Sequence, residues 1–541
     1  MSCKDTRERV GALDFDVVVV GAGFAGMYML HRLRGMGFSV RVFERGGGVG
    51  GTWYWNRYPG ARVDGPSMQY SYSFSPELEQ EWRWTEHFAA QPELERYANH
   101  VADRFGLRRD IQFDTAVTSA TWDDTQQLWS IGTGRGDTVT ARWFVAATGC
   151  LSATNVPGFP GLDTFKGRWL HTSRWPKEGI DLLGKRIGIV GTGSTGIQAI
   201  PELAAEAAHL YVFQRTPAYS LPSDNRPLEP EFEQDWKRRY RELRQAARKT
   251  WFGSVAFVAA ERSALEVPED ERDRIYEAAW GKYGGVLTAF NDLTVNEAAN
   301  ETASEFVRKK IRQIVKDPGV AEKLSPRDYP IATKRICIDN GYYETFNRPN
   351  VTLVDVKADP IQAITPTGLR TANAAYDLDV LVFATGFDAM TGPLFRMNIT
   401  GRNGVKLQDK WAAGPRTYLG LATEGFPNLF IIAGPGSPSV LSNMMVSIEQ
   451  HVEWISNLLD HARNTGTDAV EAKRDAEDAW VDHVNAVADD TLYRRANSWY
   501  VGANIPGKPR VFMPYVAGVG TYRERCDAVA AAGYDGFRLQ S

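Results

Sequence analysis

Runs of consecutive apolar residues mark the strands that this chain is expected to form. The first run, D-V-V-V-V-G-A-G-F-A-G-M-Y-M-L, opens with four valines that indicate a buried parallel strand. Three glycines, Gly21, Gly23 and Gly26, follow directly and lead into a predicted helix. A second apolar strand, S-V-R-V-F-E, ends at Glu44, 23 residues after Gly21. This order of strand, glycine turn, helix, strand and acid predicts a dinucleotide site.

The glycines of this first turn have separate tasks. The first allows the tight turn, the second lets a pyrophosphate approach the backbone, and the third lets helix and strand pack closely. Phe24 and Ala25 stand between the second and third glycines. The carboxylate of Glu44 is expected to accept a hydrogen bond from a ribose hydroxyl. A purely structural glycine-rich turn is the alternative.

The same pattern returns in G-K-R-I-G-I-V-G-T-G-S-T-G-I-Q, where a strand over 186–190 precedes Gly191, Gly193 and Gly196. The next strand, L-Y-V-F-Q-R-T-P, ends in Arg215, whereas the matching strand of the first unit ends in an acid. A carboxylate there would repel a 2′-phosphate, but an arginine can form a charge-assisted contact with one. We interpret the first unit as an FAD site and the second as an NADP site; a surface arginine at a strand end is the alternative.

Two apolar strands that end in Ala-Thr-Gly mark the boundaries between these units. One is R-W-F-V-A-A-T-G, ending at Gly149, and the other is L-D-V-L-V-F-A-T-G, ending at Gly386. The predicted fold class is therefore α/β, with two Rossmann-like units, the second nested in the first. The predicted domains are an FAD-binding domain of 1–149 and 386–541, an NADP-binding domain of 150–216 and 331–385, and a polar helical insertion of 217–330.

Composition narrows the class of partner. Hydrophobic residues make up 43% of the chain and charged residues 24%, which is the usual balance of a globular protein. The net charge is only -4, which argues against nucleic-acid and anionic-membrane partners. The 16 tryptophans and 21 tyrosines fit either aromatic-lined pockets or large cores.

Cysteine spacing and the start of the chain predict the compartment. Cys3, Cys150, Cys337 and Cys526 form no Cys-x-x-Cys pair, which argues against a disulfide framework, a metal site and a disulfide reductase. The charged start, M-S-C-K-D-T-R-E-R, lacks the apolar core of a signal peptide, and glycines interrupt the longest apolar stretch. We expect a cytoplasmic protein without a membrane partner.

One histidine stands between aromatic residues in F-K-G-R-W-L-H-T-S-R-W. Phe165, Gly167, His171 and Trp175 match the F-x-G-x-x-x-H-x-x-x-W signature of type I Baeyer–Villiger monooxygenases, at its usual place before the second glycine turn. The chain is identified as a member of that family, and the resemblance covers nearly its whole length. Further matching motifs are G-G-T-W-Y-W-N-R-Y-P-G-A-R-V-D at 50–64, K-R at 334–335, A-T-G-F-D-A at 384–389, G-P-G-S-P-S at 434–439 and N-S-W-Y-V-G-A-N-I-P-G-K-P-R at 497–510. The 434–439 form resembles the phenylacetone and steroid-ketone members more than the cyclohexanone ones.

The resemblance implies an activity. NADPH passes a hydride to FAD, the reduced flavin binds molecular oxygen, and a flavin C4a-peroxide attacks a small-molecule ketone to give an ester or lactone. Arg335 would be the fixed cation of this step, because a guanidinium stays charged when it is desolvated. Asp64 would orient Arg335. From the residues alone, Lys334 and Arg335 could equally be a surface pair.

The resemblance also assigns binding residues. Those expected around FAD, besides the first glycine turn and Glu44, are Thr52, Trp53, Tyr54, Trp55, Asp64, Tyr70, Val117 and Met444. Those expected around NADP+ are Arg62, Thr192, Gly193, Ser194, Thr195, Gly196, Ile197, Gln198, Arg215, Thr216, Lys334 and Arg335. Trp499 would lie on a mobile loop that folds over NADP+. The residues expected to border the substrate pocket are Ser439, Val440 and Leu441.

The isolated histidine is expected to couple the domains rather than to catalyse. A histidine can titrate near neutrality, but the implied chemistry needs no histidine base. On the linker between the nucleotide units, Phe165 and Trp175 would anchor one side each while His171 hydrogen-bonds across. The alternatives are that His171 takes part directly in catalysis, or that it is simply a buried histidine whose hydrogen bonds are satisfied.

Two other functions remain open. A flavin monooxygenase that oxidises nitrogen or sulfur centres is the nearest alternative, and Trp175 and Arg335 argue against it. A non-catalytic flavoprotein that senses redox state through NADP would show no ketone-stimulated NADPH oxidation. The sequence does not identify the ketone.

Overall fold

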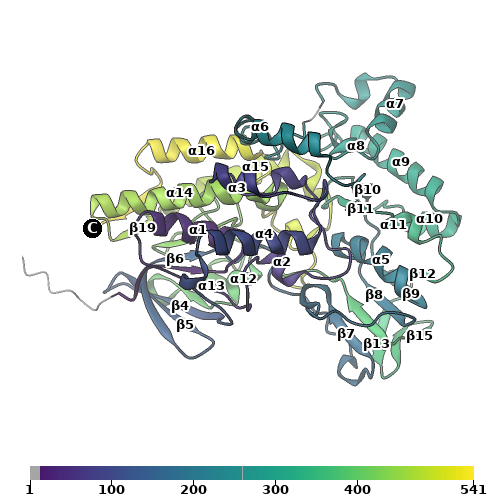
Figure 1. The fold of residues 1–541 in the computed structure, drawn as a ribbon, viewed down its shortest axis with the longest axis horizontal. Helices are drawn as coiled ribbons and strands as arrows, with labels where there is room; N and C mark the ends of the chain where they lie inside the picture. Colours follow the sequence, from purple (N-terminus) through teal and green to yellow (C-terminus); the bar gives the residue numbers. More distant parts are fainter. Residues whose placement is uncertain (1–12, 259) are drawn as a thin grey trace, which may run out of the picture.

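The computed structural model describes residues 13–258 and 260–541. The charged start of the chain, with Cys3, lies outside the described residues. The fold contains two parallel-stranded units and a group of helices, as the sequence predicts. Figure 1 shows the first unit at the left and centre, the second sheet at the lower right, and the helices α7–α10 at the upper right.

The larger sheet of the described chain belongs to the first unit. Its strand order is β17-β4-β5-β6-β1-β2-β3, and β18 also pairs with β6. The strands are β1 (Phe15–Val20), β2 (Val40–Phe43), β3 (Ile111–Gln112), β4 (Val117–Asp123), β5 (Leu128–Thr133), β6 (Thr138–Ala146), β17 (Ile399–Thr400) and β18 (Leu429–Ile431). β1 pairs in parallel with β2 and β6, as its run of valines predicts. β17 and β18 join this sheet only after the chain has built the second unit, so the second unit is nested in the first.

Helices cover the first sheet because its strands are apolar on both faces. α1 (Phe24–Gly35) packs along α14 (Met444–Thr465), and α16 (Val519–Ala531) lies beside α14 (Figure 1). The other helices of this unit are α2 (Thr52–Trp55), α3 (Pro76–Glu81), α4 (Gln91–Arg104), α12 (Gly392–Phe395), α13 (Leu407–Lys410) and α15 (Arg474–Asp489). β19 (Ala469–Ala472) and β20 (Phe537–Gln540) form an antiparallel pair near the C-terminus.

The second unit has a five-stranded parallel sheet in the order β12-β9-β8-β16-β7. Its elements are β7 (Arg168–His171), β8 (Arg186–Val190), α5 (Ser194–Glu206), β9 (His209–Gln214), α11 (Tyr342–Thr345), β12 (Val351–Asp355) and β16 (Val380–Phe383). Alternate residues of the strands β8, β9 and β16 enter two hydrophobic clusters, one on each face; Ile187 and Ile189 of β8 enter one, and Val190 the other. The antiparallel strands β13 (Ile361–Thr365), β14 (Gly368–Thr371) and β15 (Ala375–Asp377) cover the second face.

The polar stretch after the second unit's β9 is largely helical, as the sequence predicts. Its helices are α6 (Pro230–Ala247), α7 (Glu269–Ala279), α8 (Gly285–Thr288), α9 (Glu297–Ile314) and α10 (Pro318–Leu324). It begins with β10 (Ser220–Pro222), which pairs with β11 (Cys337–Asp339). α6 reaches the first unit, where Arg244 donates to the carbonyl of Gln69 at 3.1 Å. Among the described residues, no helix is both long and apolar enough to cross a membrane.

Candidate functional site

The first glycine turn is closed by backbone contacts that leave no room for side chains. Gly21 has a φ of +104°, and a Cβ there would lie 2.6 Å from the carbonyl oxygen of Ala147. A Cβ on Gly26 would lie 1.8 Å from the carbonyl oxygen of Gly21. The first and third glycines are therefore required by packing, as the sequence predicts.

A second glycine turn rests on the first. The backbone N–H of Gly50 donates to the carbonyl of Ala22 at 3.0 Å, and a Cβ on Gly51 would lie 2.8 Å from the Cα of Gly23. This contact brings α2, which carries Thr52, Trp53, Tyr54 and Trp55, against the glycine turn.

Glu44 is buried and engaged with backbone. Its two carboxylate oxygens accept hydrogen bonds from the N–H groups of Ala22 at 2.7 Å and Gly46 at 2.6 Å. Burial raises the pKa of Glu44, against the effect of these donors. Glu44 thus holds the glycine turn in place, and its contact with a ribose hydroxyl stays a prediction.

Aromatic side chains line the space beside this turn. Trp53 donates from Nε1 to the hydroxyl of Tyr70 at 3.2 Å, and the edge of Tyr70 meets Phe24, with ring centroids 6.0 Å apart. Met444 opens α14 and packs in part against the same cluster. Val117 opens β4 and is buried in the core on the other face of the sheet, with Val18 and Phe43.

The second glycine turn repeats the geometry of the first. Gly191 has a φ of +110°, and a Cβ there would lie 2.5 Å from the carbonyl oxygen of Ala384. A Cβ on Gly196 would lie 2.3 Å from the carbonyl oxygen of Gly191, whereas a Cβ added to Gly193 meets no described residue within 4 Å. The middle glycine therefore faces open space, and the turn fits the close approach of a pyrophosphate.

Two cations converge beside this turn. Arg215 is exposed just after β9, and the Thr192 hydroxyl donates to the carbonyl of Thr216 at 3.1 Å. Burial and then the charge of Arg215 lower the pKa of Lys334 to about 8. Two positive side chains held close enough to repel form a suitable donor set for a doubly charged phosphate.

The N-terminal end of α5 docks on the first unit through Gln198. Its side-chain oxygen accepts from the Tyr58 hydroxyl at 2.8 Å, and its side-chain nitrogen donates to the Arg62 carbonyl at 3.0 Å. Gly60 fits beneath, since a Cβ there would lie 2.2 Å from the Gln198 carbonyl oxygen. The Arg62 guanidinium donates to the Phe88 carbonyl at 2.5 Å. Thr195 and Ile197 belong to the same first turns of the helix.

Arg335 and Asp64 form a two-point ion pair between the units. Nε and one terminal nitrogen of Arg335 donate to the two oxygens of Asp64, at 3.0 Å and 2.8 Å. The other terminal nitrogen donates to the Val440 carbonyl at 3.0 Å. Burial opposes the charge of Arg335, but Asp64 more than offsets it and the pKa of Arg335 rises. The structure thus holds a permanent cation, with one hydrogen bond from each of its three nitrogens, at the boundary of the two units.

Ser439, Val440 and Leu441 form one buried 3-10 turn directly before α14. The Ser439 hydroxyl contacts the sulfur of Met390 at 3.8 Å, and both residues have positive φ, 42° and 65°. Cys150 belongs to the same hydrophobic cluster. Strained backbone of this kind persists only where the surrounding packing fixes it.

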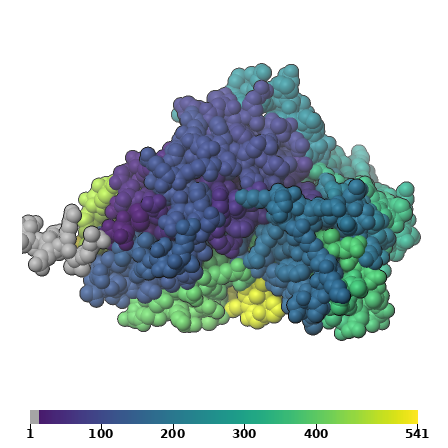
Figure 2. All heavy atoms as spheres, turned by 60° about the horizontal axis from the view of Figure 1, so that its bottom comes forward, coloured from purple at the N-terminus to yellow at the C-terminus, as the bar shows by residue number. Residues whose placement is uncertain are grey.

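The C-terminal segment closes over this region. Trp499, half-buried, packs on Tyr500 with ring centroids 4.4 Å apart. Further along, Lys508 donates to the carboxylate of Asp388 at 2.6 Å, and Asn504 to the carbonyl of Phe387 at 2.6 Å. Figure 2 shows part of this yellow C-terminal region at the surface where the two units meet.

The structure corrects one prediction about the histidine motif. Phe165 and Trp175 were expected to anchor different units, but they are buried on opposite faces of the same second sheet. Gly167 lies against Phe165, because an added Cβ would be 2.5 Å from its ring. β7 ends at His171 and is an edge strand of that sheet, so both aromatic residues are drawn into its two cores.

His171 bonds locally. Its Nδ1 accepts from the backbone N–H of Ser173 at 3.1 Å, so the proton lies on Nε2, which has no hydrogen-bond partner among the described residues. Burial lowers the pKa of His171 to about 4, with Arg174 contributing, while the backbone at Asn155 and Gly386 acts in the opposite direction. Asn155 and Gly386 lie where the chain crosses between the units, and a coupling role for His171 stays a prediction.

Some residues near Arg335 were not predicted from the sequence. Tyr500 and Tyr283 lie near Arg335, and both raise its pKa. Tyr500 follows Trp499 directly, which was a usable signal, but Tyr283 comes from the helical stretch and no motif marks it. The backbone carbonyl that orients Arg335 likewise carries no sequence signal.

The chain resembles known proteins over its full length. The family model described as "Pyridine nucleotide-disulphide oxidoreductase" matches residues 15–244. The described cysteines, Cys150, Cys337 and Cys526, are buried and free, so that match concerns the nucleotide-binding architecture. A "Baeyer-Villiger monooxygenase" of Pseudooceanicola batsensis is 46% identical over 98% of this chain and 97% of its own. A "Phenazine N-monooxygenase PhzNO1" of Lysobacter antibioticus is 42% identical over 97% of each chain.

Solved structures agree with these relatives. An "Oxidized steroid monooxygenase bound to NADP" superposes with a TM-score of 0.93 and 52% identity, and the match covers 97% of this chain and 99% of that one. This identity fits the predicted leaning toward the steroid-ketone members. The full-length identity, the two glycine turns and the histidine motif lead to one assignment: the chain belongs to the Baeyer–Villiger monooxygenase family.

Proposed function

We propose that this protein is an FAD-containing, NADPH- and O2-dependent monooxygenase that converts a small-molecule ketone into an ester or lactone. The observation that carries the proposal is the two-point pair of Arg335 and Asp64, whose third donor bonds the Val440 carbonyl. It joins Asp64 of the first unit to Arg335 of the segment that returns to the second unit, and each of these units carries a glycine turn. A fixed cation at the meeting point of two nucleotide sites suits a reaction in which one nucleotide reduces the other and an anion then attacks the substrate.

The first unit would hold FAD. The residues proposed to contact it are Gly21, Gly23, Phe24, Ala25, Gly26, Glu44, Thr52, Trp53, Tyr54, Trp55, Asp64, Tyr70, Val117 and Met444. When bound, NADPH supplies a hydride and FAD activates dioxygen for insertion beside the carbonyl. The edge-on aromatic residues Trp53 and Tyr70 would exclude water from this side of the site.

The second unit would hold NADPH. The residues proposed to contact it are Arg62, Thr192, Gly193, Ser194, Thr195, Gly196, Ile197, Gln198, Arg215, Thr216, Lys334, Arg335 and Trp499. Arg215 and Lys334 would bind the 2′-phosphate, because each can donate a charge-assisted hydrogen bond to it.

Arg335 and Asp64 act through charge. Arg335 would stabilise the negative charge that the attacking oxygen carries and that passes to the carbonyl oxygen of the ketone, and it needs no proton transfer to do so. Asp64 fixes the plane of the guanidinium by accepting two of its hydrogen bonds. Ser439, Val440 and Leu441 would border the ketone, and their buried turn also supplies the carbonyl that orients Arg335.

We propose the domain limits that the sequence predicts. The FAD-binding domain comprises residues 1–149 and 386–541, the NADP-binding domain comprises residues 150–216 and 331–385, and the helical insertion comprises residues 217–330. We also retain the proposals of a cytoplasmic location, from cysteines that form no Cys-x-x-Cys pair, and of no nucleic-acid partner, from the small net charge.

The test uses the purified holoenzyme with linear, cyclic, aryl and polycyclic ketones under labelled dioxygen. Ketone-stimulated NADPH oxidation and a product heavier by one labelled oxygen atom are the expected results. Atom balance requires that the second oxygen atom leaves as water. NADPH oxidation that no ketone stimulates, with no oxygenated product, would contradict the proposal.

Oxygenation of a nitrogen centre is a second candidate, favoured by one observation. A relative covered along 97% of its length is named a phenazine N-monooxygenase. The family's architecture therefore accommodates a nitrogen substrate, and Trp175 and Arg335 do not by themselves exclude N-oxygenation. A phenazine and a thioether added to the same panel decide whether N- or S-oxides form faster than esters.

A further inference from the structure

Tyr329 lies where the chain returns from the helical stretch to the second unit, and no motif marks it. Its side chain is 7% exposed. The Lys334 ammonium lies 4.2 Å from the centre of the Tyr329 ring, within the range of a cation–π contact. The ring thus fixes where the Lys334 charge stands.

The Tyr329 hydroxyl reaches the other cationic segment. It donates to the carbonyl of Pro217 at 3.0 Å, two residues after Arg215. It also accepts from the backbone N–H of Tyr219 at 3.4 Å. One side chain therefore contacts Lys334 and the segment that follows Arg215, although the two cations are more than a hundred residues apart in sequence.

A second tyrosine makes the reciprocal link. Tyr219 donates from its hydroxyl to the carbonyl of Pro326 at 3.1 Å, and its ring meets Tyr329 edge-on, with centroids 5.5 Å apart. Each tyrosine thus bonds a proline carbonyl in the other's segment. Proline has a fixed φ, so both acceptors stand on stiff backbone.

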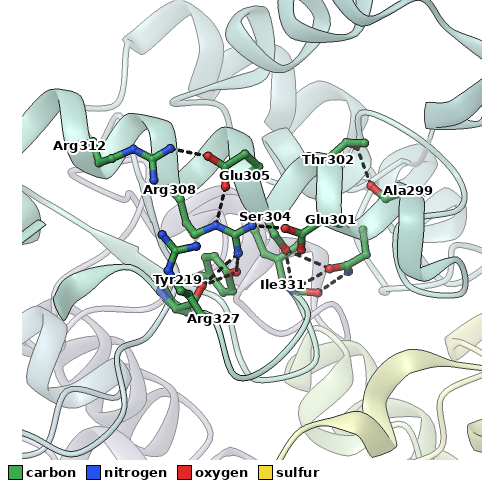
Figure 3. Close-up of polar contacts among 12 residues, drawn as sticks. Tyr219, Ala299, Glu301, Thr302, Ser304, Glu305, Arg308, Arg312, Arg327 and Ile331 are labelled. Carbon is green, nitrogen blue, oxygen red and sulfur yellow. Dashed lines mark hydrogen bonds and ion pairs between the residues drawn. The ribbon is translucent and has the colours of Figure 1, made fainter. Parts of the chain in front are cut away.

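Arg308 of α9 also bonds to this pair of segments. It donates to the Tyr219 hydroxyl and to the Pro326 carbonyl, both at 3.2 Å. Figure 3 shows its guanidinium between Tyr219 and the carboxylates of Glu301 and Glu305. The buried arginine connects the helical stretch to the two segments that carry the cations.

We infer that Tyr329 is a positioning residue for the 2′-phosphate of NADPH: it holds the Lys334 ammonium on its ring and ties that segment to the one carrying Arg215. The inference rests on the proposed function, which assigns the phosphate to this pair of cations. Mutual repulsion between Lys334 and Arg215 would separate them in a looser site, since the charge of Arg215 contributes to the lowered pKa of Lys334. The tyrosine link holds them together before the cofactor arrives, which removes an ordering cost from binding.

Two variants separate the contributions of hydroxyl and ring. Tyr329→Phe keeps the ring and loses the bond to Pro217; Tyr329→Leu loses both. The holoenzyme is assayed for kcat and KM with NADPH and with NADH. We expect the NADPH-to-NADH ratio of kcat/KM to fall about three- to tenfold in Tyr329→Phe. It should fall about ten- to thirtyfold in Tyr329→Leu. The effect should lie in KM for NADPH, with kcat and the NADH constants unchanged.

Tyr211→Phe is the matched control. Tyr211 lies on β9 of the same sheet, and its ring packs edge-on against Tyr376, with centroids 5.1 Å apart. The NADPH-to-NADH ratio of kcat/KM for Tyr211→Phe should equal that of the wild type. FAD content and Tm are recorded for every variant, and if Tyr329→Leu does not fold, Tyr329→Phe decides.

The possible results separate a failure of the role inferred for Tyr329 from a failure of the proposed NADPH site. A wild-type enzyme without preference for NADPH overturns the phosphate assignment and the inference with it. A wild type that prefers NADPH, with Tyr329→Phe retaining that full preference, overturns the inference alone. Equal losses with both nucleotides would show that Tyr329 serves general stability, which also overturns it.

Discussion

Arg335 and Asp64 are joined by two parallel hydrogen bonds although 271 positions separate them in the chain. A bidentate pair of this kind fixes both the position and the plane of the guanidinium. Burial lowers the pKa of Arg335, but Asp64 together with Tyr500 and Tyr283 raises it further, so Arg335 stays charged at every working pH. The pair therefore joins the first unit to the segment that closes the second.

Arg335→Ala should separate reduction from oxygenation. The variant should bind FAD and, at NADPH concentrations that offset the loss of one proposed contact, oxidise NADPH, since neither nucleotide turn is altered. Ester yield should nevertheless fall by about a hundredfold or more with the loss of the fixed charge. Released hydrogen peroxide should replace the missing product. Parallel assays of NADPH, peroxide and ester check this. Arg335→Lys keeps the charge but not the two-point geometry, so its ester yield should lie between those of the wild type and Arg335→Ala. A wild-type ester yield from Arg335→Ala would refute the proposed role of Arg335 in oxygenation.

Arg215→Ala should alter the choice of nucleotide. One charge-assisted hydrogen bond contributes about 1.5–3 kcal/mol, so the KM for NADPH should rise roughly ten- to a hundredfold. The KM for NADH should stay within about twofold, because NADH has no 2′-phosphate. Steady-state kinetics with both nucleotides measure this. A similar rise for both would remove Arg215 from the phosphate site.

Gly26→Ala and Gly196→Ala should each disable one nucleotide site. The added methyl groups would stand 1.8 Å and 2.3 Å from carbonyl oxygens of their own turns, so those turns must open. Gly26→Ala should lose FAD, measured by the ratio of flavin to protein absorbance. Gly196→Ala should keep FAD and bind NADPH weakly.

Gly35→Ala is the control for these variants. Gly35 ends α1, the helix that Gly26 helps to start, and an added Cβ there would meet nothing within 4 Å in the part of the chain that the structure describes. It should keep full flavin content. Loss of flavin in all three variants, or in none, would contradict the roles assigned to the two turns.

His171→Gln should leave the pH dependence of product formation unchanged above about pH 5. The pKa of His171 is lowered to about 4, so the ring is neutral throughout that range and supplies no proton. His171→Gln should keep partial activity, and His171→Ala should lose more. A selectively abolished and pH-altered oxygen-transfer step in His171→Gln would show that the histidine is catalytic.

The same histidine should contribute to acid unfolding. Its folded pKa lies below the ordinary value of 6.5, so its stabilisation is complete above pH 6.5 and is lost as the pH falls toward 4. Over that interval His171→Gln should lose less stability than the wild type, by up to about 3 kcal/mol. Denaturant titrations at pH 7 and pH 4 measure the difference. The buried His451, whose pKa is about 3, is present in both proteins and cancels.

The sequence by itself determined the local units. In each nucleotide site the strand, glycine turn and helix are contiguous, so their geometry follows from backbone sterics within about fifteen residues. β8 is found over 186–190, as the sequence predicts. The change from Glu44 to Arg215 at the end of the following strand is equally local, and it distinguishes the two sites before any packing is known.

The tertiary structure determined which distant segments of the chain lie side by side. The pairing of Arg335 with Asp64, and of Tyr329 with Pro217, depends on two units and a helical stretch meeting, and no periodicity encodes that meeting. For the same reason Phe165 and Trp175 were wrongly expected to anchor different units. Their motif marks an edge strand, and the burial of apolar side chains on the two faces of that strand's own sheet outweighed any contact across the linker.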